Sequence, residues 1–186
     1  LERAHLLGAS MGGMIVQEMA IAAPERVLSL TSVMSTTGDP DVGQPTPEAV
    51  AVLLTPPAPD RAAYLEQSLE AGRLLAGPVH CDEDLILERN AAAYDRCFHP
   101  DGQTAQLLAI VTSPPRTEAL RAIDVPALVI HGEIDPLVVI SGGERTAEAL
   151  RGSTFLRLED MGHDISRYYW ATIIEHVTSL AARSAA

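Results

Sequence analysis

The apolar positions of this chain fall into two patterns: short unbroken runs, and longer stretches in which they recur every three or four residues. The short runs are bounded by turn residues and predict β-strands at residues 4–7, 27–34, 127–130 and 154–158. The longer stretches predict helices at residues 10–23, 48–54, 61–75, 82–97, 103–111, 116–122, 142–150 and 166–182. Strands alternate with helices at both ends of the chain, which predicts βαβ units and a parallel sheet.

The middle of the chain departs from this alternation. Residues 35–59 are crowded with glycine and proline, and no strand pattern occurs between residues 39 and 113. We therefore expect an α/β fold of about four strands, with residues 1–38 and 114–186 as the core and residues 39–113 as a helical cap. The helix at 10–23 is apolar on most faces, so we expect it to be buried on more than one side.

Composition and charge exclude several classes of protein. Acidic residues outnumber basic ones by 25 to 13, and the net charge of −12 disfavours nucleic acids and anionic membranes as partners. The sequence has no apolar run of about 20 residues and no signal-peptide pattern, so neither a membrane span nor export is expected. Cys81 and Cys97 flank one predicted helix and are too far apart to form a disulfide, which indicates a reducing compartment, the cytoplasm.

One motif near the start carries chemistry. Residues 8–12 read Gly-Ala-Ser-Met-Gly and lie between the first predicted strand and the first predicted helix. A strand, a tight turn with a serine at its tip and a helix form the context of a nucleophile elbow, here at Ser10. Side chains at positions 8 and 12 are expected to collide with the neighbouring backbone, which accounts for the glycines. The helix then points unpaired N–H groups at the reacting atom, so the backbone N–H of Met11 is the expected oxyanion donor.

A serine hydroxyl becomes a nucleophile only when a base takes its proton and a carboxylate orients that base. Asp135 and His163 follow the ends of two further predicted strands, at the sheet edge where Ser10 also lies. Imidazole suits the role of base near neutral pH. The sequence therefore predicts Ser10 as nucleophile, His163 as base and Asp135 as acid.

Other residues compete for these roles. Glu133 is the alternative acid, whereas Asp164 is expected to face solvent because it adjoins His163 in the sequence. His131 is the alternative base, although its place at a strand end favours a role in shaping the loop. The other histidines are expected to be structural, at positions 5, 80, 99 and 176. The acidic residues after His80 are interpreted as a helix cap, so no metal and no cofactor are expected.

These motifs resemble those of the α/β-hydrolase superfamily. The resemblance rests on residues 8–13 (GASMGG), 129–136 (VIHGEIDP) and 162–164 (GHD). It is strongest to the serine esterases similar to aclacinomycin methylesterase, with proline-iminopeptidase-like and carbon–carbon-bond hydrolases as relatives. The resemblance implies the order nucleophile, acid, base along the chain, and a serine at the elbow argues against the haloalkane-dehalogenase branch.

The resemblance also implies sheet strands ahead of the elbow that this chain lacks, together with a second oxyanion donor. Because the chain starts at Leu1, we expect a fragment whose first strand is an exposed, unpaired edge of the sheet. Such a fragment is expected to be poorly soluble and close to inactive by itself. Beyond a small-molecule substrate, the expected partner is a second copy bound through this edge.

The function expected from these features is a serine hydrolase that forms an acyl-enzyme from a carboxylic ester of a small to mid-sized apolar molecule. The apolar preference is inferred from leucines of the cap, at positions 53, 54, 69, 74, 75, 107 and 108. Three alternatives stay open: a carbon–carbon-bond hydrolase or cofactor-free perhydrolase on the same triad, a non-catalytic ligand-binding protein, and an inactive truncated fragment.

Overall fold

The computed structural model describes residues 1–184 and contains one parallel sheet of four strands, in the order β1-β2-β3-β4. The strands are β1 (Ala4–Ala9), β2 (Val27–Val33), β3 (Ala127–Gly132) and β4 (Thr154–Leu158). The helices are α1 (Met11–Ala22), α2 (Pro47–Leu53), α3 (Arg61–Ala76), α4 (Glu83–Arg96), α5 (Pro100–Thr112), α6 (Thr117–Arg121), α7 (Ser141–Ala149) and α8 (Trp170–Ser184), with single 3₁₀ turns at Pro24–Arg26 and Arg167–Tyr169. The α/β class and the parallel sheet are thereby confirmed.

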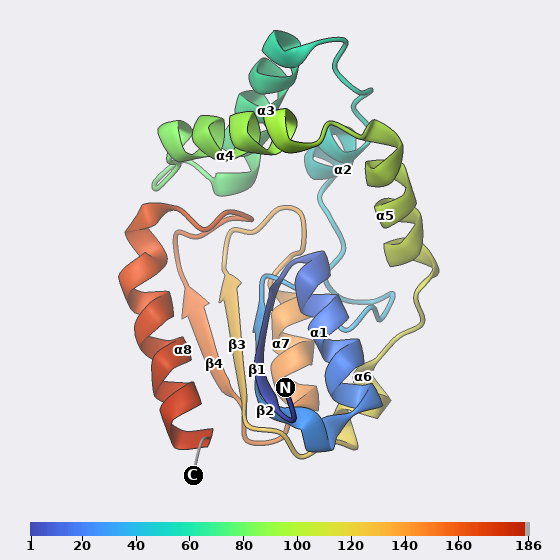
Figure 1. Cartoon of the computed structure of the whole chain (residues 1–186), viewed down its shortest axis with the longest axis vertical. Coiled ribbons are helices and arrows are strands. Elements are labelled where there is room, and N and C mark those ends of the chain that lie inside the picture. The colour runs from blue at the N-terminus through green and yellow to red at the C-terminus, as the bar shows by residue number, and fades with distance from the viewer. Residues whose placement is uncertain (185–186) are drawn as a thin grey trace.

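Helices cover both faces of the sheet (Figure 1). Because side chains alternate along a strand, β3 contributes Val129 to the core shared with α1, α6 and α7, and Leu128 and Ile130 to the core shared with α8. This double burial explains the continuous apolar run of β3. The strand extends two residues beyond the predicted 127–130, because His131 and Gly132 continue the register against β4.

Helix α1 packs less completely than its sequence indicates. Val16, Gln17 and Ala20 are buried, but Ile15 and Met19 are each 49% exposed. The expectation that this helix is buried on more than one side is wrong, because its buried residues lie on one face and leave Ile15 and Met19 half-exposed. Strand β1 likewise pairs with β2 alone and forms one edge of the sheet.

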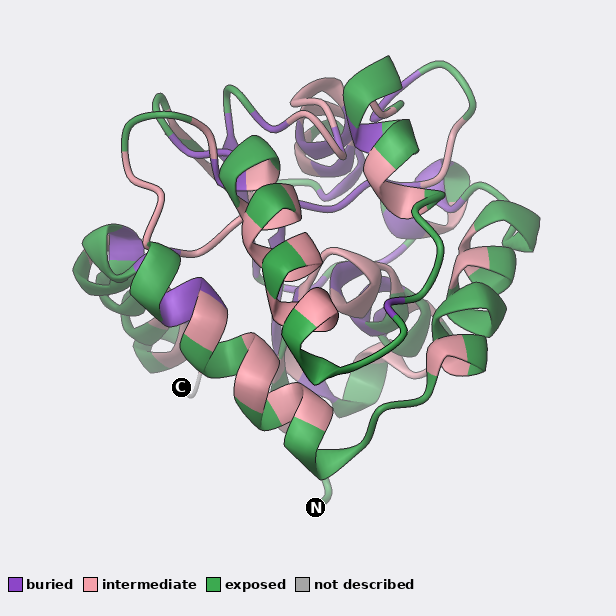
Figure 2. Cartoon of the chain, turned by 90° about the horizontal axis from the view of Figure 1, so that it is seen from above, coloured by how far each residue is buried: buried purple, intermediate pink, exposed green. Residues whose placement is uncertain are grey.

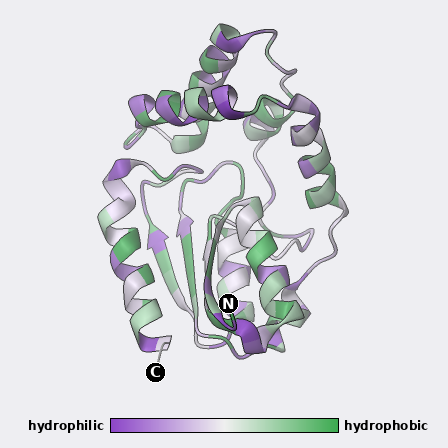
Figure 3. Ribbon diagram, in the orientation of Figure 1, coloured by the Kyte–Doolittle hydropathy of each residue, from purple (hydrophilic) through white to green (hydrophobic). Residues whose placement is uncertain are grey.

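Helices α2, α3 and α4 lie above the carboxyl ends of the strands, and α5 descends at one side, beyond α1 (Figure 1). Seen from above, these helices are largely exposed or half-buried, whereas the centre beneath them is buried (Figure 2). The sheet is mostly hydrophobic, while α3 and α4 mix hydrophobic and hydrophilic residues (Figure 3). The helices therefore have the position predicted for a cap, and the division into core and cap at residues 38/39 and 113/114 stays a prediction.

The two chain segments that join these helices to the sheet are tied together by Arg116. Its backbone N–H donates to the carbonyl oxygen of Thr37 (2.8 Å), and its guanidinium donates to the carbonyl oxygen of Thr36 (3.1 Å) and to Oε1 of Gln17 (3.1 Å). Burial lowers the pKa of Arg116, and the half-exposed Glu18 opposes that shift from 3.6 Å. The segment that leaves the core and the segment that returns to it are thus held against α1.

Within the described residues, we find no helix that combines the length and the hydropathy needed to cross a bilayer.

Candidate active site

Ser10 occupies the sharp turn between β1 and α1. Its φ of 54° and ψ of −120° fall where residues other than glycine are rare. The turn is held on both sides, because the Ser10 N–H donates to the carbonyl oxygen of Val33 (2.9 Å) and the Ser10 carbonyl accepts from the N–H of Met14 (3.2 Å). This strained geometry raises the serine above the sheet at the carboxyl end of β1.

The two glycines of the motif have different surroundings. A Cβ on Gly8 would lie 2.0 Å from the carbonyl oxygen of Gly12, whereas a Cβ on Gly12 would meet nothing within 4 Å. The collision predicted for position 8 is present, and the one predicted for position 12 is wrong. The reason is that Gly12 faces the side of α1 that no described element covers.

Ser10, His163 and Asp135 form a continuous chain of hydrogen bonds. The Oγ of Ser10 lies 2.9 Å from Nε2 of His163, and Nδ1 of His163 lies 2.7 Å from Oδ2 of Asp135. An ionised carboxylate only accepts hydrogen bonds, so Nδ1 carries the proton and Nε2 is the acceptor for the serine hydroxyl. This is the tautomer that a general base requires.

Asp135 is held rigidly in the interior. Its side chain has no exposed surface, and its Oδ1 accepts from the backbone N–H groups of Leu137 and Val138, each at 2.9 Å. These bonds occupy one carboxylate oxygen and leave the other for His163. Only 8% of the His163 side chain is exposed, so the hydrogen bonds that join the three residues are shielded from water.

The competing acids lie elsewhere. Glu133 pairs with Arg157 at 2.9 Å, and Asp164 pairs with Arg89 at 2.5 Å. The expectation that Asp164 faces solvent is wrong, because the side chain is only 11% exposed beneath α4.

The competing histidines are also engaged away from Ser10. Nε2 of His131 contacts the carbonyl oxygen of Val138 at 2.7 Å, and burial lowers the pKa of this imidazole. His5 contacts the hydroxyl of Ser29 at 2.8 Å, His176 contacts the Thr172 carbonyl at 2.8 Å, and His80 stacks on Tyr168. Within residues 1–184, no cluster of three or more His, Cys, Asp or Glu side chains is arranged to hold a metal ion.

Met11 is the first residue of α1. Its N–H therefore belongs to the first helical turn, where backbone donors have no partner within the helix. This position suits a donor to an oxyanion formed next to Ser10, and that role stays a prediction.

The His163 loop is held from above by contacts that the sequence does not predict. The N–H of His163 donates to the carbonyl oxygen of Leu75 at the end of α3 (2.6 Å), and Arg89 of α4 holds Asp164. A Cβ on Gly162 would lie 2.1 Å from the same Leu75 oxygen, so the loop and α3 touch backbone to backbone. No local sequence signal marks these contacts, because they join residues far apart in the chain.

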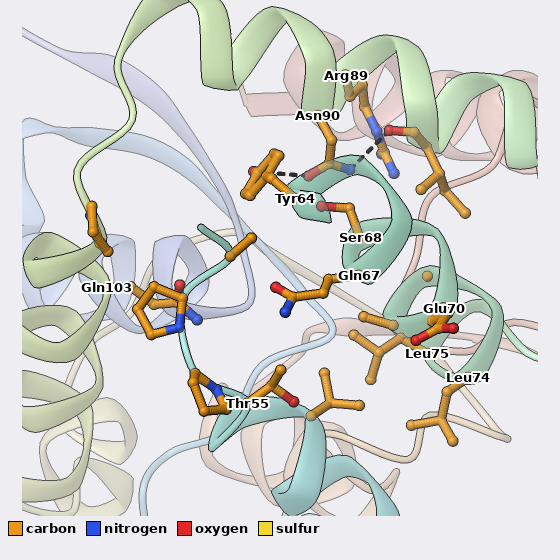
Figure 4. Close-up of a pocket in the computed structure, with 18 of the residues that line it drawn as sticks. Thr55, Tyr64, Gln67, Ser68, Glu70, Leu74, Leu75, Arg89, Asn90 and Gln103 are labelled. Carbon is orange, nitrogen blue, oxygen red and sulfur yellow. Dashed lines mark hydrogen bonds between the residues drawn. The ribbon is translucent and has the colours of Figure 1, made fainter. Parts of the chain in front are cut away.

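A cavity of about 510 Å³ reaches His163 from the side of α3 and α4 (Figure 4). This volume is in the range of small-molecule sites. Polar side chains form much of its wall, namely Thr55, Tyr64, Gln67, Ser68, Glu70, Arg89, Asn90, Gln103 and Asp164. Of the seven cap leucines from which an apolar substrate was inferred, Leu74 and Leu75 line this cavity. Those leucines are therefore a weak basis for that inference.

Comparisons with known proteins address the fold. A family model described as alpha/beta hydrolase fold matches residues 1–166. The rhodomycin D methylesterase of Streptomyces sp. (strain C5) is 29% identical over 188 residues, covering 86% of this chain and 60% of that protein. The pimeloyl-(acyl-carrier protein) methyl ester esterase of Neisseria meningitidis serogroup B / serotype 15 (strain H44/76) is 29% identical over 187 residues, covering 96% of this chain and 66% of that protein.

Among solved structures, an esterase from Rhodococcus sp. ECU1013 superposes with a TM-score of 0.70 at 21% identity, over 95% of this chain and 66% of that one. The chain spans about 60% of the length of the methylesterase and 66% of the length of the methyl ester esterase.

Proposed function

Because this chain belongs to the α/β-hydrolase fold family, as its motifs predicted, we propose that it carries the Ser-His-Asp site of a serine hydrolase that cleaves carboxylic esters. The observation that carries the proposal is the pair of hydrogen bonds in series, 2.9 Å from Ser10 to His163 and 2.7 Å from His163 to Asp135. Two similar proteins are named as methyl ester esterases, which supports an ester as the substrate.

The reaction follows from the geometry. As Oγ of Ser10 bonds to the ester carbonyl carbon, its proton passes to Nε2 of His163. The carbonyl oxygen becomes an oxyanion, for which the Met11 N–H is the proposed donor. The tetrahedral intermediate collapses when the C–O bond to the alcohol breaks, and the alcohol leaves with the proton from His163. The product of this first half of the reaction is an acyl-enzyme on Ser10.

Water completes the cycle by the same route. His163 takes a proton from water as the water oxygen attacks the acyl carbon, and it returns that proton to Oγ of Ser10 as the free acid leaves. Asp135 stabilises the imidazolium that forms in both halves.

Active-site labelling tests the proposal without requiring knowledge of the substrate. A fluorophosphonate reacts only with a serine that a base activates, so we expect the 186-residue chain to be labelled and Ser10→Ala to be unlabelled. Ser113→Ala is the matched control, since Ser113 is an exposed serine outside the site. Equal labelling of the chain and of Ser10→Ala would contradict the proposal.

Labelling also separates this proposal from a non-catalytic ligand-binding protein, because a serine that no base activates does not react with the fluorophosphonate. Cleavage of a carbon–carbon bond on the same triad is distinguished by product analysis, because ester hydrolysis releases an alcohol and an acid.

A further inference from the structure

The cavity above His163 has a distinctive distribution of charge. Its described lining contains three charged side chains besides His163: Glu70, Arg89 and Asp164. The guanidinium of Arg89 is engaged by Asp164 at 2.5 Å, so those two charges cancel. Arg73, the next basic residue along α3, pairs with Glu83 at 2.6 and 2.8 Å and is not part of the lining. Glu70 is exposed and lies near enough to Arg73 to raise the pKa of that guanidinium, but it forms no ion pair among the described residues, so it adds negative charge to the wall.

The neutral polar groups of the wall offer hydrogen bonds of both kinds. Gln67 extends from α3 into the cavity, and its amide has both a donor and an acceptor (Figure 4). Beside it, Asn90 is fixed in orientation, because its Nδ2 donates to the Ile86 carbonyl (2.8 Å) and its Oδ1 accepts from the Tyr64 hydroxyl (3.2 Å). Ser68 adds a hydroxyl on the same helix as Gln67.

Apolar side chains complete the lining, among them Val52, Leu75 and Phe98. They suit the methylene groups of a substrate but not a polar end group. A purely alkyl chain would leave the Gln67 amide without hydrogen bonds when it displaced water, and such desolvation is unfavourable. A carboxylate would have to give up its hydration next to Glu70, with no cation to replace the lost water.

We propose, on the basis of the proposed function, that this cavity selects esters whose acyl group is neutral and ends in a hydrogen-bonding group such as an amide, hydroxyl or ketone. Acyl groups that end in a carboxylate are disfavoured. Gln67 is the specificity-determining residue for the neutral polar group, and Glu70 is the residue that rejects the anion.

Three nitrophenyl esters of matched length test this selection: the heptanoate, the adipamate, which ends in an amide, and the monoadipate, which ends in a carboxylate. Each kcat/KM is divided by the rate of hydroxide-catalysed hydrolysis of the same ester. We expect the adipamate to exceed the heptanoate, and to exceed the monoadipate by about tenfold or more, because a polar site discriminates strongly against groups that leave it unpaired. Equal values for adipamate and monoadipate would overturn the proposal.

Two substitutions assign the effect to residues. Gln67→Leu should lower the ratio of kcat/KM for the adipamate to kcat/KM for the heptanoate by about tenfold. Glu70→Gln should raise the ratio of kcat/KM for the monoadipate to kcat/KM for the adipamate several-fold. Glu66→Gln is the matched control, because Glu66 lies on the same helix but does not line the cavity. If Glu66→Gln and Glu70→Gln have the same effect, the assignment to Glu70 is wrong.

Binding distinguishes a failure of this inference from a failure of the proposed function. Ser10→Ala cannot form an acyl-enzyme, yet its cavity is intact, so ligand-observed NMR with methyl adipamate and with monomethyl adipate reads the selection without turnover. We expect methyl adipamate to bind at least tenfold more tightly than monomethyl adipate, a difference of about 1.4 kcal/mol, and Glu70→Gln in the same background to reduce that preference. A Ser10→Ala chain that binds monomethyl adipate as tightly as methyl adipamate refutes the selection, whatever the labelling experiment shows.

Discussion

Gly8 and Gly12 stand at equal distances from Ser10 in the sequence, but the free space beside them differs. An added methyl group at position 8 would lie 2.0 Å from a backbone oxygen, while one at position 12 has open space around it. We expect Gly8→Ala to lower the free energy of unfolding by about 3 kcal/mol, because backbone must move to relieve the contact. Gly12→Ala should raise it by about 0.5–1 kcal/mol, since alanine is the better helix former.

Urea denaturation of the two variants measures this difference, with fluorophosphonate labelling as a second readout. The labelling rate should fall in Gly8→Ala, because the turn that presents Ser10 is displaced. Equal loss of stability in both variants would show that a methyl group at position 12 does not have open space around it.

The free energy of unfolding is expected to depend on pH through His131. Its side chain is wholly buried, and burial holds its pKa below the ordinary value of 6.5 although the nearby Asp135 opposes this shift. The unfolded chain therefore binds more protons than the folded one once the pH falls below about 6.5. It follows that the free energy of unfolding decreases as the pH falls from about 7 towards 5.

Chemical denaturation at several pH values checks this expectation with two variants. His131→Gln should flatten the dependence between about pH 7 and 5. His99→Gln removes an exposed histidine and should leave the slope unchanged. An unaltered slope in His131→Gln would mean that other groups cause the loss of stability in acid.

At the scale of elements, α3 and α4 hold the loop that carries the base. The Leu75 carbonyl receives the His163 N–H, and Arg89 pairs with Asp164 next to it. We predict that Arg89→Met lowers the labelling rate about tenfold, because small displacements of a catalytic group are costly. The free energy of unfolding should also fall, by about 1–3 kcal/mol, because the Asp164 side chain is only 11% exposed and its carboxylate loses its cation.

The same two helices provide the control. Arg61 of α3 and Asp95 of α4 form an ion pair at 2.7 Å that is exposed and outside the site. Arg61→Met therefore removes a similar interaction between α3 and α4 without touching the loop, and should label at the rate of the unsubstituted chain. If both variants lose reactivity equally, the effect belongs to the packing of the helix pair and not to support of His163.

At the scale of the whole molecule, the β1 edge of the sheet has no paired strand within residues 1–184. Leu7 of β1 is 53% exposed, and Ile15 and Met19 of the following helix α1 are each 49% exposed. Unpaired strand edges beside apolar surface favour association with another chain. We propose that two copies of this chain associate through this edge.

Sedimentation velocity over a range of concentrations tests the association. Leu7→Lys should shift the distribution towards the monomer, because a charged side chain at a strand edge opposes pairing. Ile174→Lys places the same charge at a 58% exposed position on α8 and should leave the distribution unchanged. An equal effect of both substitutions would point to net charge, which is −12, in place of the edge.

The order of strands and helices could be predicted from residue pattern alone, because hydrophobic periodicity records which face of each element is buried. The places of Ser10, Asp135 and His163 at strand ends followed from the same pattern, since parallel strands bring their carboxyl ends to one edge. The alanine- and leucine-rich helices between residues 39 and 113 were likewise visible as helices, within a few residues of α2 to α5.

Other properties were decided only when the chain packed. Four such properties are the open space beside Gly12, the exposed face of α1, the partner of Asp164 and the polar wall around Gln67. They depend on which distant segments meet, and the residue pattern within one element does not predict those contacts. Arg89 and Asp164 are 75 residues apart and have no shared motif, yet they meet at 2.5 Å beside His163. Local sequence specified which residues stand at the strand ends, whereas tertiary contact decided how the His163 loop is supported and which side chains line the cavity beside it.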